Sequence, residues 1–302
     1  MIQPVLSAAV ADALAAGRPV VALESTIFSN LGLPSPANRA ALDRCIAAVE
    51  MAGAVAAVTA VLDGVPRVGL APSDHDRILG AARKAAERDL PVAVAQRWEF
   101  GATTVSASVA LAAAAGIAVF ATGGIGGVHR GAELTGDVSA DLDALAHHHV
   151  VTVCAGAKAF LDLGRTLEYL ETVGVPVLGW QHDEFPAFYT RSSGLAVPHR
   201  VESAAEVAAV YLNLTRASSG VLVGVPIPTV DELDPSELDR VLVRALADAE
   251  EAGVVGAAVT PFVLGRIASA TDGQSVPANL ALAEHNARVA GAIAAAIASS
   301  SR

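Results

Sequence analysis

Short runs of β-branched and small apolar residues alternate along this chain with longer alanine-rich segments of helical periodicity. The strand-like runs are "PVVALES", "AVAAVTAVLDG", "PVAVAQ", "IAVFATGG", "VVTVCAG", "PVLGW" and "GVLVGVPI". Helical patterns cover residues 3–16, 36–52, 73–87, 103–115, 139–148, 158–173, 202–215, 235–252 and 276–299. The alternation predicts a layered α/β/α fold around a central, largely parallel or mixed sheet, in a single domain over residues 1–302. Active sites in such folds lie where strands end and loops begin.

The amino-acid composition limits the kinds of partner that such a protein can bind. The 302 residues are 53% hydrophobic but only 4% aromatic, which predicts a core of Ala, Val and Leu. The apolar run "ASVALAAAAGIAVFA" is divided by Gly116, so we interpret it as buried core and not as a membrane span. A net charge of -11 without a basic cluster argues against nucleic-acid and membrane partners and favours small-molecule substrates. Two distant cysteines, Cys45 and Cys154, and no signal-like start favour a reducing, cytoplasmic location.

Lysine is scarce in this chain. Of its 20 basic residues only Lys84 and Lys158 are lysines, which leaves 18 arginines. A buried lysine amine can lose its proton and attack a carbonyl, whereas a guanidinium stays protonated. Lys84 lies in "ILGAARKAAERDLP", a polar helix end where a solvated lysine is ordinary, whereas Lys158 lies among small residues in "VCAGAKAF". Lys158 is therefore the candidate for covalent chemistry. The alternative is that both lysines are ordinary residues on solvated faces, retained by chance.

Two other strand ends carry polar groups. Glu24 ends the first strong strand in "VVALESTIFSN", where desolvation would raise its pKa and make it a proton donor; a structural glutamate is the alternative. The glycine-rich "ATGGIGGVHRGAE", residues 121–133, contains Thr122 and has His129 and Arg130 at its exit. Its glycines would let backbone amides approach an anion, but a tight structural turn explains them equally well.

Acidic and histidine residues follow the glycine-rich stretch. In "TGDVSADLDAL", Asp137, Ser139 and Asp141 suit an oxygen-ligated divalent metal or sugar hydroxyls, with a helix N-cap role for Asp137 as the alternative. The consecutive histidines 147–149 would point in different directions, which favours a solvated helix end over a metal site. Residues 181–200, with "DEFPAFYTRSSG", lack periodicity and are predicted to form a functional loop.

Together, "VALEST", "FGATTVSAS", "VFATGGIGGVHRGAE", "DVSADL" and "VCAGAKAFLDLG" resemble the pseudouridine-5'-phosphate glycosidase family, from about residue 18 to the C-terminal helix. The resemblance implies reversible cleavage of the bond between C1' of ribose 5-phosphate and C5 of uracil, a divalent metal, usually Mn²⁺, and a homotrimer. It implies that Lys158 forms an imine with ring-opened ribose, that Glu24 donates the proton and that Asp137 binds the metal. The implied substrate-binding residues are Lys84, Val105, Thr122, His129, Ser139, Ala140, Asp141 and Asn279.

The chemistry of a carbon–carbon glycosidic bond explains the need for an amine. An ordinary glycosidase protonates a departing oxygen, and a C-glycoside offers none. An opened sugar exposes C1', which an amine can hold as an iminium that accepts the bonding electrons. Arginine could not replace lysine in that role.

Two stretches depart from the usual family pattern. "SNLGLPSPAN" has Asn30 and Leu31 where the family commonly has histidine, and the bulky "QRWEF" precedes "GATTV". Trp98 and Phe100 of this segment could stack on an aromatic ring or fill a core or subunit interface. The sequence therefore does not determine which ring is joined to the sugar. The alternatives are a C-glycosynthase that joins ribose 5-phosphate to a ring other than uracil, and a non-catalytic sugar-phosphate-binding protein.

Overall fold

One eleven-stranded sheet organises the protein. A computed structural model describes residues 2–80, 82–216, 219–254, 256 and 259–300. All strand pairs in this part of the chain are parallel except β3–β4 and β3–β6, which confirms the predicted fold class. The strands lie in the order β1 (Val5–Leu6), β4 (Val65–Val68), β3 (Val55–Leu62), β2 (Val20–Leu23), β7 (Val119–Ala121), β8 (Val151–Cys154), β11 (Val221–Gly224), β9 (Val177–Trp180) and β10 (His199–Val201), with β6 (Phe100–Thr103) on β3 and β5 (Arg83–Ala85) on β6.

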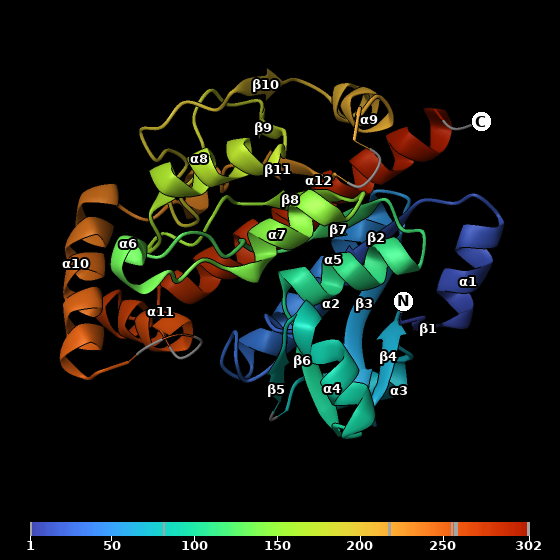
Figure 1. Cartoon of the computed structure of the whole chain (residues 1–302), viewed down its shortest axis with the longest axis horizontal. Coiled ribbons are helices and arrows are strands. Elements are labelled where there is room, and N and C mark those ends of the chain that lie inside the picture. The colour runs from blue at the N-terminus through green and yellow to red at the C-terminus, as the bar shows by residue number, and fades with distance from the viewer. Residues whose placement is uncertain (1, 81, 217–218, 255, 257–258, 301–302) are drawn as a thin grey trace.

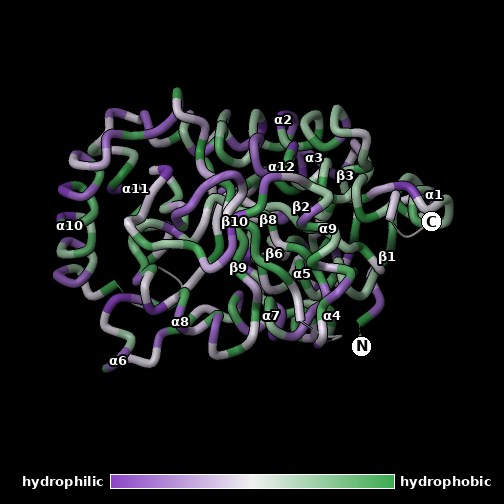
Figure 2. The backbone as a smooth tube through the Cα atoms, turned by 90° about the horizontal axis from the view of Figure 1, so that it is seen from above, coloured by the Kyte–Doolittle hydropathy of each residue, from purple (hydrophilic) through white to green (hydrophobic). Residues whose placement is uncertain are grey.

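Helices cover both faces of the sheet (Figures 1 and 2). One face carries α2 (Ala37–Met51) and α12 (Ser275–Ser300), and α9 (Ala204–Leu212) packs on α12; the other carries α5 (Val105–Ala114), α7 (Ala140–His147) and α8 (Leu163–Val173). The helices α10 (Pro235–Glu251) and α11 (Val259–Ala270) pack on each other at one end of the molecule. The other α-helices of the described residues are α1 (Ala8–Ala15), α3 (Pro72–Ile78), α4 (Leu90–Ala95) and α6 (Ala132–Thr135).

Small residues allow the alanine-rich helices to approach closely. A methyl group added to Gly291 of α12 would lie 2.5 Å from the Cβ of Ala52, just beyond α2. The apolar run over residues 107–121 divides into the end of α5 and strand β7, both buried, as predicted. Within the described ranges, no helix has the length and apolarity needed to span a bilayer.

The connections of the sheet change direction between β2 and β7. From β2 the chain passes through α2 to β3, and from β7 it passes through α7 to β8, on the other side of β2. The two crossover helices lie on opposite faces (Figure 2). In α/β proteins, ligands bind in the crevice at such a switch point, beyond the carboxyl ends of the strands.

The predicted helix over residues 73–87 is wrong in its second half. Helix α3 ends at Ile78, and the chain then enters β5, where Lys84 pairs with Ala102 of β6. Asn30 helps to hold this segment, because its Oδ1 accepts a hydrogen bond of 3.1 Å from the amide of Ala82. Lys84 is therefore a strand residue, because pairing with β6 overrides the helical propensity of the alanines around it.

The predicted strand "PVAVAQ" is helix α4. Leu90 and Ala93, three residues apart, are buried, whereas Val92 and Val94 are 41% and 38% exposed. That pattern follows the period of a helix, and Pro91 lies in its first turn, where no amide donor is needed. The β-branched composition was therefore misleading.

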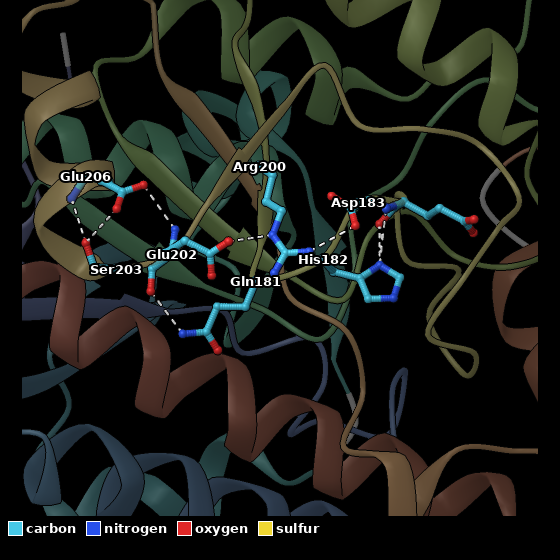
Figure 3. A network of polar contacts seen from close by, with 8 residues as sticks. Gln181, His182, Asp183, Arg200, Glu202, Ser203 and Glu206 are labelled. Carbon is cyan, nitrogen blue, oxygen red and sulfur yellow. Dashed lines mark hydrogen bonds and ion pairs between the residues drawn. The ribbon is translucent and has the colours of Figure 1, made fainter.

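The predicted loop between β9 and β10 is irregular, and polar contacts tie its two ends together (Figure 3). Arg200 donates to Asp183 over 2.9 Å and to Glu202 over 2.5 Å. Gln181 Nε2 donates to the carbonyl of Glu202 over 3.0 Å. Such exposed pairs contribute little stability each, but they fix where this loop leaves and rejoins the sheet.

Candidate active site

Three predicted residues meet at the carboxyl ends of β2, β7 and β8. Glu24 follows β2 and is only 8% exposed, and Thr122, directly after β7, donates its hydroxyl to Glu24 Oε1 over 2.5 Å. Lys158 lies in the loop after β8, and its amide donates to the carbonyl of Ile125 over 3.1 Å. Helix α8 begins only at Leu163, later than predicted, so Lys158 lies in this loop.

Burial dominates the acid–base behaviour of Glu24. It raises the pKa of this carboxyl group to about 7, against the lowering effects of Lys158, the Thr122 hydroxyl and Lys84. Asp141 adds to the increase in this pKa through charge repulsion. Near neutral pH the group can therefore both give and accept a proton, which a general acid–base catalyst requires.

The second lysine belongs to the same cluster. Although Lys84 is exposed over part of its surface, desolvation by the surrounding protein lowers its pKa, and the charge of Lys158 lowers it further. Asp141, Glu24 and Asp137 oppose this shift in the pKa of Lys84. The two lysines of the chain thus lie in one electrostatic environment, although 74 residues separate them.

His129 and Asp137 form the rim of this cluster, on either side of α6. The His129 amide donates to the Asp137 carbonyl over 3.0 Å, and His129 Nδ1 lies 3.7 Å from Asp137 Oδ2. Burial lowers the pKa of His129, opposed by Asp137 and assisted by Lys158 and Lys84. The N-cap alternative for Asp137 is wrong, because the side chain of Ser139 caps α7.

Asp141 connects the glycine-rich loop to helix α5. It is only 6% exposed, its Oδ1 accepts the Ser106 amide over 3.0 Å, and its Oδ2 accepts the Gly126 amide over 2.8 Å. Val105, the residue before Ser106, is the buried first residue of α5. In this structure Asp141 therefore positions the loop, while Ser139 and Ala140 present the start of α7 beside it.

The glycine-rich loop is a turn that hydrogen bonds to other parts of the protein hold in place. The amides of Ile125, Gly126, Val128 and His129 donate to protein acceptors, which favours the structural explanation over an anion cradle. A methyl group added to Gly126 would lie 2.2 Å from the Ser139 hydroxyl. The glycines therefore allow close packing between loops.

Asn279 carries a hydrogen-bond acceptor without a partner, close to the same loop. Asn279 of α12 is 6% exposed, and its buried Oδ1 has no hydrogen-bond partner. This atom lies 3.5 Å from the position of a methyl group added to Gly123. A buried unsatisfied acceptor costs about 1–3 kcal/mol, so Asn279 is a candidate to accept an N–H from a ligand.

The loop between β9 and β10 supplies neighbours that the sequence did not single out. Tyr189 is buried, which raises its pKa, and the side chains of Ser275 and Asn279 oppose this shift. Phe188 adopts a left-handed φ of 65°, rare for a bulky residue, and its amide donates to the Ala155 carbonyl over 2.9 Å. The only signal for these residues was the aperiodic "PAFY".

Other predicted candidates lie elsewhere. His147 interacts with Asp143, His148 with Glu87 and His149 with Ser219, so the three histidines diverge as predicted. Across the described part of the chain, no three His, Cys, Asp or Glu residues are grouped to hold a metal.

The two aromatic residues that depart from the family pattern belong to the core. Trp98 and Phe100 are 7% and 6% exposed, and the guanidinium of Arg83 lies 3.7 Å from the centroid of Trp98. The core alternative is thus supported over stacking on a ligand.

A cavity of about 610 Å³ opens beside the cluster, between the start of α8, the β9–β10 loop and α10. Arg130 and Ala159, the neighbours of His129 and Lys158, contribute to its lining. The cavity around Glu24 and Thr122 is only about 10 Å³. We therefore define the site by its polar groups and regard the larger cavity as adjoining it.

Buried hydroxyl groups lie behind the end of β2. Thr103 Oγ1 donates to the Thr59 carbonyl over 2.8 Å and contacts the hydroxyls of Thr59 and Ser25 at 2.8 and 3.1 Å. Thr59 in turn bonds Ser108 over 2.8 Å, and all four residues are inaccessible to solvent. These bonds join β2, β3, β6 and α5 beneath the site.

We expect Thr103→Val to lower the free energy of unfolding by about 2–4 kcal/mol, because it leaves buried hydroxyls without their partner. Urea denaturation at constant pH measures this loss. Thr172→Val is the matched control, since the exposed Thr172 hydroxyl bonds only within its own helix. Equal losses for the two variants would contradict the role of the buried hydroxyl group.

These features define a class: an α/β enzyme whose buried acid faces two lysines at the switch point of its sheet. The model of the family described as indigoidine synthase A like protein matches residues 9–296, and the chain belongs to that family.

Similar proteins carry three kinds of name. A Nocardioides protein named pseudouridine-5'-phosphate glycosidase is 50% identical over 289 residues, 94% of each chain. A Cupriavidus pinatubonensis protein of the same name is 47% identical over 301 residues, 98% of this chain and 95% of the relative. The prealnumycin C-glycosynthase AlnA, solved in complex with ribulose 5-phosphate, superimposes with a TM-score of 0.90 at 36% identity, over 99% and 98% of the two chains. An indigoidine synthase A-like protein of Thermotoga maritima gives 0.88 at 34%, over 98% and 97%.

Proposed function

We propose that this protein is a pseudouridine-5'-phosphate glycosidase, which reversibly joins and separates ribose 5-phosphate and uracil through their C1'–C5 bond. The observation that carries the proposal is the convergence of a buried Glu24, with a pKa of about 7, and Lys158 at the switch point. The names of relatives that are 47–50% identical over nearly the whole chain support the same activity. Two of the residues implied by resemblance are thus in a geometry that suits their roles.

In the synthetic direction, the neutral amine of Lys158 condenses with the C1' aldehyde of opened ribose 5-phosphate and releases water. C5 of uracil then attacks C1', and the electrons of the iminium double bond move to nitrogen. Ionised Glu24 accepts the proton that C5 loses. The sugar 4-hydroxyl finally attacks C1', gives up its proton and displaces the amine, which closes the ring.

In the cleavage direction the same steps run backwards. The amine displaces the ring oxygen at C1', and that oxygen gains a proton. Protonated Glu24 delivers its proton to C5 as the C1'–C5 bond breaks, which leaves uracil and the Lys158 imine. Water hydrolyses the imine and releases ribose 5-phosphate. Asn279, whose buried Oδ1 has no hydrogen-bond partner, would accept an N–H of the ring.

Asp137 would hold the divalent ion. One half-exposed carboxylate, without a cluster of further protein ligands among the described residues, suits a hard cation such as Mn²⁺ that keeps several waters, and does not suit zinc. When bound, such an ion supplies positive charge for bound water or phosphate.

Removing the metal with a chelator is expected to abolish turnover, and added Mn²⁺ to restore it. Asp137→Asn should raise the Mn²⁺ concentration for half-maximal activity by about tenfold or more, because an amide lacks the carboxylate charge. Calorimetric titration of Mn²⁺ measures the affinity separately. Asp143→Asn, an exposed acidic residue of α7, is the control. Equal Mn²⁺ affinity in wild type and Asp137→Asn would contradict this assignment.

The test of the activity is direct. Purified protein is incubated with Mn²⁺, ribose 5-phosphate and uracil, and pseudouridine 5'-phosphate is followed by mass. Turnover supports the glycosidase. An adduct on Lys158 after borohydride without uracil turnover would indicate a C-glycosynthase with another acceptor, and no adduct would indicate a non-catalytic binding protein.

The location and assembly of the protein are part of this proposal. Both cysteines are buried and free, which suits a reducing compartment such as the cytoplasm. The homotrimer follows from the resemblance and stays a prediction.

A further inference from the structure

The side chain of Asn286 in α12 hydrogen-bonds to the backbone just after strand β7. It is inaccessible to solvent, and its side-chain amide donates to the carbonyls of Thr122 and Gly123 over 2.8 and 3.2 Å. Its own Oδ1 has no hydrogen-bond partner. Neither carbonyl belongs to a named strand, so these bonds hold the backbone just beyond the sheet.

The residue that Asn286 holds is the one that binds the candidate acid. The amide of Thr122 donates to the Val153 carbonyl over 3.0 Å, and its own carbonyl accepts from Asn286. The Gly123 carbonyl also accepts the Ala155 amide over 2.9 Å. The backbone of Thr122 is thus fixed at both ends while its hydroxyl reaches Glu24.

Stability alone does not explain an asparagine at this position. The unpaired Oδ1 costs about 1–3 kcal/mol, and an apolar side chain of similar volume such as leucine would remove that cost. The two donated bonds contribute about 1 kcal/mol net each, which roughly cancels that cost and leaves little net gain in stability. The contribution of Asn286 is therefore to fix the position of the peptide bond between residues 122 and 123.

We propose that Asn286 is a positioning residue for the acid, which holds the 122–123 peptide so that the Thr122 hydroxyl meets the Glu24 carboxyl group. The inference rests on the proposed function, in which Glu24 moves the proton to and from C5. The hydrogen bonds of Asn286 lead to Glu24 through Thr122, so we expect its main effect on proton transfer.

The pH dependence distinguishes this role from a merely structural one. The charged groups that face Glu24 are Lys158 after β8, Lys84 on β5 and Asp141 on α7, whereas the Asn286 amide donates to the backbone carbonyls of Thr122 and Gly123. The Thr122 hydroxyl stabilises the ionised carboxylate and so lowers the pKa of Glu24. Loss of that bond raises this pKa, so the alkaline fall of cleavage activity moves to higher pH.

The test compares Asn286→Leu with wild type in cleavage assays across pH 5–9. We expect kcat to fall about 10- to 100-fold, with KM almost unchanged and the alkaline limb shifted upward. Thr122→Val should shift the limb in the same direction, and the double variant should add little to either single change because both act through one bond.

Asn38→Leu is the matched control, since Asn38 is also buried and its side-chain amide donates to a different backbone carbonyl, that of Leu79, over 3.2 Å. Thermal unfolding is measured for every variant, and Asn286→Ala replaces Asn286→Leu if the latter does not fold. An unchanged kcat and pH limb, or a loss of stability alone, would overturn the proposal.

A readout without turnover separates this inference from the proposed function. Infrared titration of the Glu24 carboxyl, as a difference against Glu24→Gln, follows its ionisation directly. An upward shift in Asn286→Leu supports the positioning role even if the wild-type enzyme uses neither uracil nor ribose 5-phosphate. No shift contradicts the role, whatever reaction the enzyme catalyses.

Discussion

Lys158→Arg is expected to abolish turnover, by on the order of 10⁴-fold or more, although the variant keeps the positive charge. A guanidinium stays protonated and does not form an imine, so only the amine can hold C1'. Mass spectrometry after incubation with ribose 5-phosphate and borohydride should find the reduced adduct on the peptide that contains Lys158 in wild type and no adduct in Lys158→Arg.

Lys84→Arg is the informative control for that experiment. It changes the other lysine of the cluster, keeps its charge and leaves the Lys158 amine in place. We expect weaker substrate binding with the adduct still on Lys158. Full turnover in Lys158→Arg, or an adduct only on Lys84, would refute the covalent mechanism.

Glu24→Gln is expected to lower kcat by about 10²- to 10⁴-fold, the usual contribution of a general acid or base. The amide keeps the size of the side chain but carries no transferable proton at neutral pH. Condensation at Lys158 does not depend on this proton, so the borohydride-trapped adduct should persist. An adduct without turnover is therefore the expected signature.

In the wild type, the two directions should depend on pH with opposite sign. Cleavage needs protonated Glu24 and should decline as pH rises through about 7, whereas synthesis needs the ionised form and should increase there. The same profile in Glu24→Gln and wild type would show that another group moves the proton.

Glu24 should also lower the stability of the fold as it ionises. Because its folded-state pKa is raised from 4.5 to about 7, the folded protein binds this proton more tightly than the unfolded chain does. The carboxyl group therefore makes its full contribution to stability at low pH, and this contribution is lost between about pH 4.5 and 7.

The central strands and the catalytic pair could be predicted because local signals agreed. Buried parallel strands appear as short apolar runs, and polar groups at their ends are conspicuous. Glu24 and Lys158 each follow such a run, and the scarcity of lysine singled out an amine. The sequence did not indicate that β2 and β7 are neighbours, because that adjacency depends on the direction of each crossover.

The edge of the sheet was harder to predict, because its strands are short and depend on pairing. β5 has three residues, and contact with β6 decides its conformation. One local signal was overlooked: Asp63 and Gly64, with φ of 54° and 73°, form the tight turn between β3 and β4 that an Asp-Gly pair favours.

The supporting residues of the site could not be predicted at all from local patterns. Asn286 lies 164 positions from Thr122, within a helix whose periodicity indicates only burial. Tyr189 appears in a stretch without periodicity. Their roles follow from contacts that exist only after the chain has folded.

The irregular stretch between β9 and β10 is fastened where it leaves and rejoins the sheet, whereas its middle lies against the reaction centre. We therefore expect the middle of this segment to tolerate substitution while the bonds of Arg200 to Asp183 and Glu202 hold its two ends. Substitutions there would leave the amine and the acid in place, because Glu24 follows β2 and Lys158 follows β8. Variants of this segment are therefore the ones to test for the formation of new C-glycosides.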